Sequence, residues 1–163
     1  MLRVNPIHLA VFSALLSISS SSVGAEPACK TTNPTTSQVP VPWQNKLDPG
    51  ARSIWFGSES LAVLVPRDGV WGGSGRENDY GNKLWFWSED WSLQEEPQPA
   101  LKVYARELND EKLRSESAST THGYGPGWEA MLTGLGFPAP GCWEISSFYR
   151  ASKVTFVVKV LDR

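Results

Sequence analysis

Acidic residues beside tryptophans are the first candidates for chemistry in this chain. Glu89 and Asp90 lie between two tryptophans, and Glu144 follows a third. Hydrolysis of a glycosidic bond needs two carboxyl groups, one kept protonated in an apolar setting and the other ionised. Neighbouring residues of a strand point to opposite sides, so Glu89 and Asp90 are not expected to face one substrate. A cell-wall or polysaccharide hydrolase that uses these carboxylates is therefore the weaker of two functional hypotheses.

Histidine is scarce, which excludes several other kinds of site. The chain has 2 histidines, and His8 belongs to an N-terminal segment that is expected to be removed. A zinc or copper site built from several imidazoles is therefore excluded within one protomer. His122 stands among glycines, which predicts a surface residue in a turn, and no Gly-X-Ser-X-Gly segment supports a Ser-His-Asp triad. A calcium site is only weakly indicated, since oxygen ligands are present at Asn78, Asp79 and Asn82 but lack the spacing of an EF-hand loop. No cofactor is expected.

The tryptophans offer a candidate binding surface. The chain contains 8 of them, and Trp85 and Trp87 are two residues apart, so both project from the same face of a strand. Trp91, together with Tyr80 and Trp71 on neighbouring segments, joins them around a polar loop. The interpretation that we favour is that these side chains fill the core of a tryptophan-rich sandwich. Aromatic faces beside polar groups also suit sugar rings or peptide segments, so if the protein binds a ligand, we expect the contact surface to be formed by Tyr80, Trp85, Trp87 and Trp91.

Short apolar runs separated by turn residues must position these side chains. The runs recur about every ten residues, which is typical of a β-sandwich and not of alternating strands and helices. The charged segment 106–117 predicts a strand end and an exposed loop, and the glycine-rich segment 122–127 predicts a turn. Strands are expected at residues 53–56, 61–65, 70–71, 84–87, 101–106 and 128–135.

The last two apolar runs predict the closing hairpin of the sandwich. On the first strand of this hairpin Trp143 and Ile145 share one face, and Cys142 lies on the opposite one. Cys142 then faces outward, where an N-terminal arm can reach it. Apolar residues of the final strand alternate with mostly polar ones and are expected in the core: Val154, Phe156, Val158 and Val160.

The N-terminal residues predict export. Residues 1–25 combine Arg3, a short apolar stretch and small residues that end at Ala25, as a signal peptide does. That stretch is too short to span a bilayer and no later segment comes close, so the protein is not expected to be transmembrane. A lipid anchor on Cys29 is disfavoured because residues 26–28 lack the aliphatic residue of such a processing site. The expected location is extracytoplasmic, whether periplasmic, cell-surface or secreted.

Beyond the signal peptide the sequence predicts an arm and one domain. Residues 26–48 are rich in proline and threonine and predict an extended arm, and residues 49–163 predict the β-sandwich. Cys29 and Cys142 are expected to pair, because they are the only cysteines of an exported chain. The alternative is a buried thiol at Cys142 and a free Cys29.

The charges of the mature chain do not indicate a nucleic-acid-binding protein. Loss of residues 1–25 changes the net charge from −2 to −3, and the lysines and arginines are scattered and do not form the basic patch that binding to nucleic acid needs.

Several sequence features, taken in order, resemble a family of small exported bacterial proteins for which no activity is established. They are the early Cys29, Gly57 to Leu61, the Asp68-Gly69 turn, Gly123-Tyr124-Gly125 and the block Phe137-Pro138-Ala139-Pro140-Gly141-Cys142-Trp143-Glu144-Ile145. The pattern Pro-Gly-X-Trp-X-Ile is also similar to the closing hairpin of bacterial immunoglobulin-like domains. The chain departs from the exported family at Phe148-Tyr149-Arg150, where a glycine-bearing turn is usual.

The resemblance and the strand pattern together predict an all-β protein. We expect an immunoglobulin-like antiparallel β-sandwich with an N-terminal extended arm. The resemblance implies no catalytic residue. The main functional hypothesis is therefore a non-catalytic module, structural or interaction-mediating at the cell envelope, with an envelope protein or a glycan as its partner.

Overall fold

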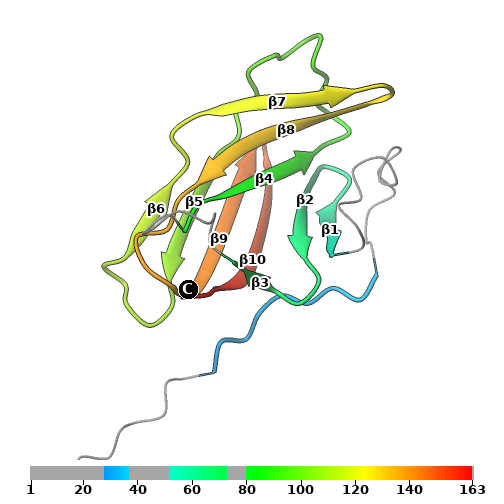
Figure 1. Cartoon of the computed structure of the whole chain (residues 1–163). Coiled ribbons are helices and arrows are strands. Elements are labelled where there is room, and N and C mark those ends of the chain that lie inside the picture. Colours follow the sequence, from blue (N-terminus) through cyan, green and yellow to red (C-terminus); the bar gives the residue numbers. More distant parts are fainter. Residues whose placement is uncertain (1–27, 37–51, 73–79, 163) are drawn as a thin grey trace, which may run out of the picture.

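The computed structural model describes residues 28–36, 52–72 and 80–162, which hold ten strands and no helix (Figure 1). The predicted signal peptide, residues 37–48 of the predicted arm, Asn78 and Asp79 lie outside these ranges. The strands are β1 (Ser53–Ser58), β2 (Leu61–Pro66), β3 (Val70–Trp71), β4 (Asn82–Trp87), β5 (Lys102–Glu107), β6 (Arg114–Glu116), β7 (Thr120–Gly125), β8 (Trp128–Leu135), β9 (Gly141–Tyr149) and β10 (Ser152–Val160).

The strands form two five-stranded sheets. Sheet A has the order β1-β2-β4-β8-β7, and sheet B has the order β3-β10-β9-β5-β6. Neighbouring strands are antiparallel throughout, apart from β3, which runs parallel to β10. The predicted all-β sandwich is therefore confirmed, and its immunoglobulin-like type stays a prediction.

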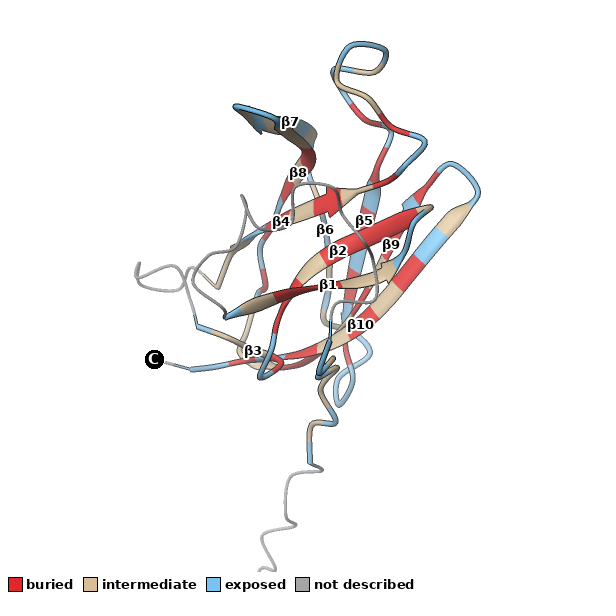
Figure 2. Ribbon diagram, turned by 90° about the vertical axis from the view of Figure 1, so that its right-hand side faces the viewer, coloured by how far each residue is buried: buried red, intermediate tan, exposed pale blue. Residues whose placement is uncertain are grey.

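One hydrophobic core fills the space between the sheets. Sheet A contributes the inward residues of β2, β4 and β8, and sheet B contributes those of β5, β9 and β10. Buried and less buried residues alternate along the strands (Figure 2), as period-two geometry requires. The prediction for the final strand is confirmed, since these residues are at most 5% exposed: Val154, Phe156, Val158 and Val160.

The closing hairpin turns without glycine. Tyr149 pairs with Ser152 across the turn, and Arg150 adopts a φ of 51°, the left-handed region that usually favours glycine. The Arg150 guanidinium lies 5.2 Å from the ring centroid of Tyr149 and 3.8 Å from a carboxylate oxygen of Glu96. These two contacts help to hold the residue in its unfavourable backbone conformation.

The N-terminal arm is attached to the outer side of sheet B. Cys29 and Cys142 form a disulfide with a Cα–Cα distance of 5.5 Å, as predicted. Thr32 continues the attachment: its N–H donates to the Val157 carbonyl (2.8 Å), and the Val157 N–H donates to its hydroxyl (2.9 Å). Thr32 thus pairs with the edge of β10 at Val157, near Lys159, where β3 pairs with the same strand.

A buried carboxylate fixes the strand end next to the disulfide. Glu107, the last residue of β5, is 5% exposed and accepts hydrogen bonds from the backbone N–H groups of Asn109, Asp110 and Cys142. At Gly141, with φ of 148°, an added Cβ would lie 2.8 Å from a Glu107 oxygen. The glycine before Cys142 is therefore required both by its backbone conformation and by this carboxylate.

The turn predicted at residues 122–127 is wrong in part, because these residues continue as β7 to Gly125 before the chain turns. The two glycines make room for tryptophan rings of neighbouring strands. A Cβ on Gly123 would lie 2.3 Å from Trp85, and one on Gly125 would lie 2.4 Å from Trp128. Glycine therefore serves close packing in a strand here, and not turn formation.

Within segment 106–117, where a strand end and a loop were expected, three residues form an additional strand. β5 ends at Glu107, and the chain then returns as β6, which pairs Arg114 with Arg106 and Glu116 with Tyr104. A three-residue strand carries too short a pattern to be recognised from sequence, since its pairing with β5 is what defines it.

Removal of the disulfide should destabilise the protein and release the arm. The bridge closes a loop with a sequence separation of 113 residues, and we expect the double variant Cys29→Ala/Cys142→Ala to lose about 2–5 kcal/mol in free energy of unfolding. Urea denaturation measures this loss. An unchanged unfolding free energy would contradict the assigned role of the bridge.

The buried hydroxyl of Ser147 predicts a change of opposite sign. Ser147 is fully buried on the core face of β9, and its Oγ has no hydrogen-bond partner among the described residues. Because a buried unsatisfied polar group is costly, Ser147→Ala should raise the free energy of unfolding by about 1 kcal/mol. Ser146→Ala is the matched control, since the Ser146 hydroxyl bonds Thr155 (3.0 Å), and it should give no gain. A clear loss of stability in Ser147→Ala would refute the prediction.

Candidate functional site

The four aromatic residues predicted to bind a ligand do not share one surface. Trp85 and Trp87 lie on the outer face of sheet A, as their spacing predicts. Trp91 is 5% exposed and belongs to the core between the sheets. Tyr80 packs partly against the same core, and its hydroxyl donates to Asp162 (3.2 Å). A ligand role on sheet A stays a prediction for Trp85 and Trp87 alone.

Indole rings cover small residues on the outer face of sheet A. Trp85, Trp87 and Trp128 are half-buried and pack around Ala62 and Ala130, which are fully buried. Trp85 and Trp128 also meet edge to face at 5.8 Å. We call this group, with the glycines of β7 below it, the tryptophan face. Its rings pack mainly within their own face, which accounts for much of their burial.

Trp91 and Glu96 organise the segment that connects the two sheets, residues 88–101. The Trp91 indole N–H donates to the Glu96 carbonyl (2.9 Å), and the Glu96 carboxylate accepts a bond from the Tyr149 hydroxyl (2.5 Å). Burial and the Glu96 charge raise the pKa of Tyr149 to about 12. Its phenol is thus protonated at neutral pH, which suits a structural hydrogen bond and not a nucleophile.

The predicted carboxylates lie on different sheets. Glu89 and Asp90 are exposed in the turn after β4 of sheet A, whereas Glu144 lies on the outer face of sheet B. Arg106 donates from Nε to Glu144 at 2.9 Å, and this bond raises the pKa of Arg106. His122 is half-buried in β7, where its Nδ1 lies 2.8 Å from the Pro97 carbonyl oxygen. The structure therefore does not pair the predicted carboxylates with one another, or with His122, in a way that would support acid-base chemistry.

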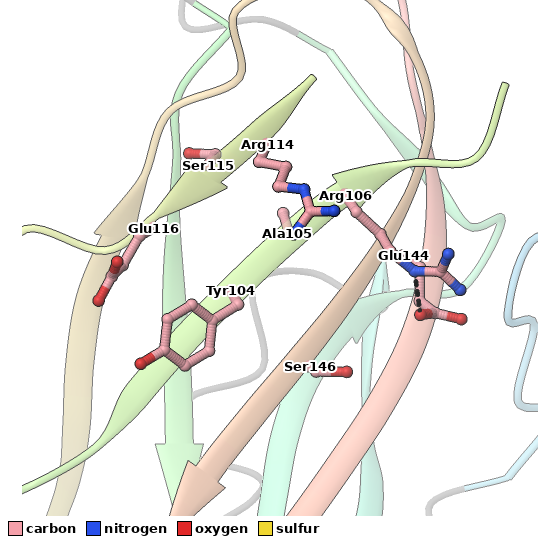
Figure 3. Close-up of a pocket in the computed structure, with 8 residues that line it drawn as sticks. All are labelled: Tyr104, Ala105, Arg106, Arg114, Ser115, Glu116, Glu144 and Ser146. Carbon is pink, nitrogen blue, oxygen red and sulfur yellow. Dashed lines mark hydrogen bonds and ion pairs between the residues drawn. The ribbon is translucent and has the colours of Figure 1, made fainter. Parts of the chain in front are cut away.

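A groove of about 550 Å³ lies on the outer face of sheet B (Figure 3). We call it the outer groove. Its lining comes from β5, β6 and β9, and consists of Tyr104, Ala105, Arg106, Arg114, Ser115, Glu116, Glu144 and Ser146.

Strand register sets the side chains of the outer groove in rows. One row crosses the sheet from Arg114 to Arg106 to Glu144, and Figure 3 shows the two arginines side by side. The next row runs Glu116, Tyr104, Ser146. Each row is held by antiparallel backbone pairing, so the positions of these side chains depend on rigid strands and not on a loop.

The third row lies beyond the groove and carries a second aromatic ring. Phe148 pairs with Lys102 on one side and Lys153 on the other. Its ring meets that of Tyr104 edge to face at 6.1 Å, and Lys153 Nζ lies 5.3 Å from its centroid. Tyr104 is 38% and Phe148 37% exposed. These are large aromatic surfaces open to solvent between cationic side chains.

Sequence reasoning missed this surface because it followed the tryptophans. The signal was present in β5, where Lys102, Tyr104 and Arg106 occupy the positions opposite to the apolar ones. On the adjacent β9 the corresponding outward residues are Glu144, Ser146 and Phe148. Each strand shows which residues point outward, but only the register shows that Tyr104 meets Phe148.

The described part of the chain holds neither a cluster of metal ligands nor a membrane-spanning helix. No group of three histidine, cysteine, aspartate or glutamate residues there could hold a metal ion. No helix in the same ranges is long and apolar enough to cross a membrane. Asn82, the described member of the predicted calcium loop, is the first residue of β4.

The different positions of Trp91 and Trp85 predict different costs of substitution. Trp91→Ala removes a core side chain and should lower the free energy of unfolding by about 3–5 kcal/mol. Trp85→Ala removes a half-buried ring from the outer face and should cost less than half as much. Urea denaturation of both variants gives the comparison. Equal losses would show that the tryptophan face is as important to stability as the core.

Comparisons of the chain with protein-family models, curated proteins and solved structures found no match. The resemblance of residues 137–145 to a family of exported bacterial proteins therefore stays a prediction.

Proposed function

We propose that this chain is an exported, non-catalytic binding module that binds its ligand on the outer groove. The observation that carries the proposal is the pair of solvent-exposed rings, Tyr104 and Phe148, set among cationic side chains beside a groove of about 550 Å³. Exposed aromatic residues flanked by polar groups are typical of binding surfaces. The rings of the tryptophan face are more deeply packed, so they offer a ligand less free surface.

The arrangement of the carboxylates supports binding over hydrolysis. A glycoside hydrolase needs a protonated acid and an ionised partner on opposite sides of one bond. In the outer groove Glu144 is bound by the Arg106 guanidinium, which is the setting of an ion pair and not of a proton donor. Glu89 and Asp90 are exposed in the turn that follows β4 of sheet A, whereas Glu144 lies on the outer face of sheet B, so the structure does not bring them together as such a pair.

Two observations support an extracytoplasmic location. The Cys29–Cys142 disulfide is typical of proteins that work in an oxidising compartment. Residues 1–25 have the composition of a signal peptide. A module at the cell envelope would meet glycans and envelope proteins, which are the partners that an aromatic and polar surface suits.

The proposal predicts binding without turnover. Purified protein incubated with insoluble peptidoglycan and with a panel of soluble polysaccharides should be retained by at least one of them and release no sugar. Tyr104→Ala and Phe148→Ala should each weaken that binding more than about fivefold. Both residues are exposed, so the free energy of unfolding should change by less than about 0.5 kcal/mol.

Tyr124→Ala is the matched control. Tyr124 is 69% exposed on β7 of sheet A, so the same substitution there should leave retention unchanged. Release of sugar that Glu144→Gln abolishes would establish the hydrolase instead. Retention that survives both Tyr104→Ala and Phe148→Ala would place the binding surface elsewhere.

A further inference from the structure

The charges around the outer groove indicate the chemistry of its ligand, an inference that rests on the proposed function. Four cations and two acids project from these rows: Lys102, Arg106, Arg114, Lys153, Glu116 and Glu144. Because Arg106 and Glu144 form an ion pair, three cations and Glu116 remain in the three rows. Glu111, in the loop before β6, is a further acid that acts on Arg106. The three rows themselves carry two more cations than acids, on a chain whose net charge is −2.

The remaining cations lie at both ends of the surface. Arg114 shares the first row with Arg106, and Lys102 and Lys153 flank Phe148 in the third. Positions 102 and 106 of β5 are four residues apart, or about 13 Å along an extended strand. A single small anion cannot contact both ends at this separation. A linear ligand with repeated acidic groups can, and the two rings lie between the ends.

The backbone of β5 and β9, the two strands that carry Tyr104 and Phe148, is already paired, and of the strands that line the groove only β6 is an edge strand of sheet B. β5 is hydrogen-bonded to β6 on one side and to β9 on the other, so its face offers a ligand side chains only. An extended peptide instead gains affinity from free backbone groups at a strand edge. The surface suits a glycan better than a peptide. The two aromatic rings can contact the apolar faces of sugars. The hydroxyls of Ser146 and Thr155, 3.0 Å apart, can bond sugar hydroxyls.

We infer that the outer groove binds a linear acidic polysaccharide that lies along β5. Arg114 contacts an acidic group at one end, because a guanidinium matches the geometry of an oxyanion. Lys102 and Lys153 contact acidic groups at the other end as point charges. Tyr104 and Phe148 contact the sugar rings between them.

Calorimetric titration with polygalacturonate, a chain of carboxylated sugars, tests this inference. Polygalacturonate should bind, and dextran at equal mass should not. The affinity should fall as NaCl is raised from about 50 mM to about 500 mM, since salt screens exposed charges. Arg114→Gln, Lys102→Gln and Lys153→Gln should each weaken binding about two- to fivefold, as expected for exposed charge contacts. Lys83→Gln, an exposed lysine on β4 of sheet A, is the matched control and should change nothing.

Three results would overturn the inference. Equal binding of dextran, lost in Tyr104→Ala but kept in the charge variants, would leave a binding groove without selectivity for acids. Tighter binding of poly-L-glutamate than of polygalacturonate, weakened by the same variants, would make the ligand an acidic peptide. Absence of polygalacturonate binding would reject the acidic glycan, and retention of another polysaccharide through Tyr104 and Phe148 would still support the proposed function.

Discussion

The alternation of side chains along β9 places the core, the disulfide and the outer groove in a single register. This strand lies between β10 and β5 in sheet B, and its inward residues Trp143 and Ile145 are fully buried in the core. Its outward residues carry the disulfide at Cys142 and the ion pair at Glu144. A slip of one residue would exchange the two sets, so core, covalent attachment and candidate site share one register.

The junction at the start of β9 connects that register to the arm. The Glu107 carboxylate accepts a hydrogen bond from the Cys142 N–H, and the Cys142 side chain forms the disulfide with Cys29. A carboxylate buried among backbone N–H groups and a cross-link therefore meet at one residue. With Thr32 bonded to Val157, the junction covers part of an edge of β10 that would otherwise offer unpaired backbone groups.

The fold could be predicted where the signals are local. β8 spans Trp128–Leu135 as expected, and the faces of the closing hairpin follow from period two and from adjacent turn residues.

Local signals gave the wrong prediction where a residue type is required by a contact with a distant part of the chain. Gly123 suggests a turn by composition, yet it is glycine because Trp85 of another strand lies over it. Trp91 and Trp85 look alike in sequence, yet Trp91, in the segment after β4, is buried in the core, and Trp85 lies on the outer face of sheet A. The outer groove depends on Arg106 meeting Glu144, which is 38 residues away, so the register of two strands was needed to find it.

Residue-resolved chemical-shift mapping would show directly whether the ligand surface is the outer face of sheet B. Polygalacturonate would be titrated into isotope-labelled protein while backbone amide and indole N–H signals are followed. Binding to the outer groove should shift amides that cluster in residues 102–106, 114–116 and 144–148, and the indole signals of Trp85, Trp87 and Trp128 should not move. Shifts confined to those indoles and to the strands beneath them would contradict binding to the outer groove, because they would place the ligand on the opposite sheet.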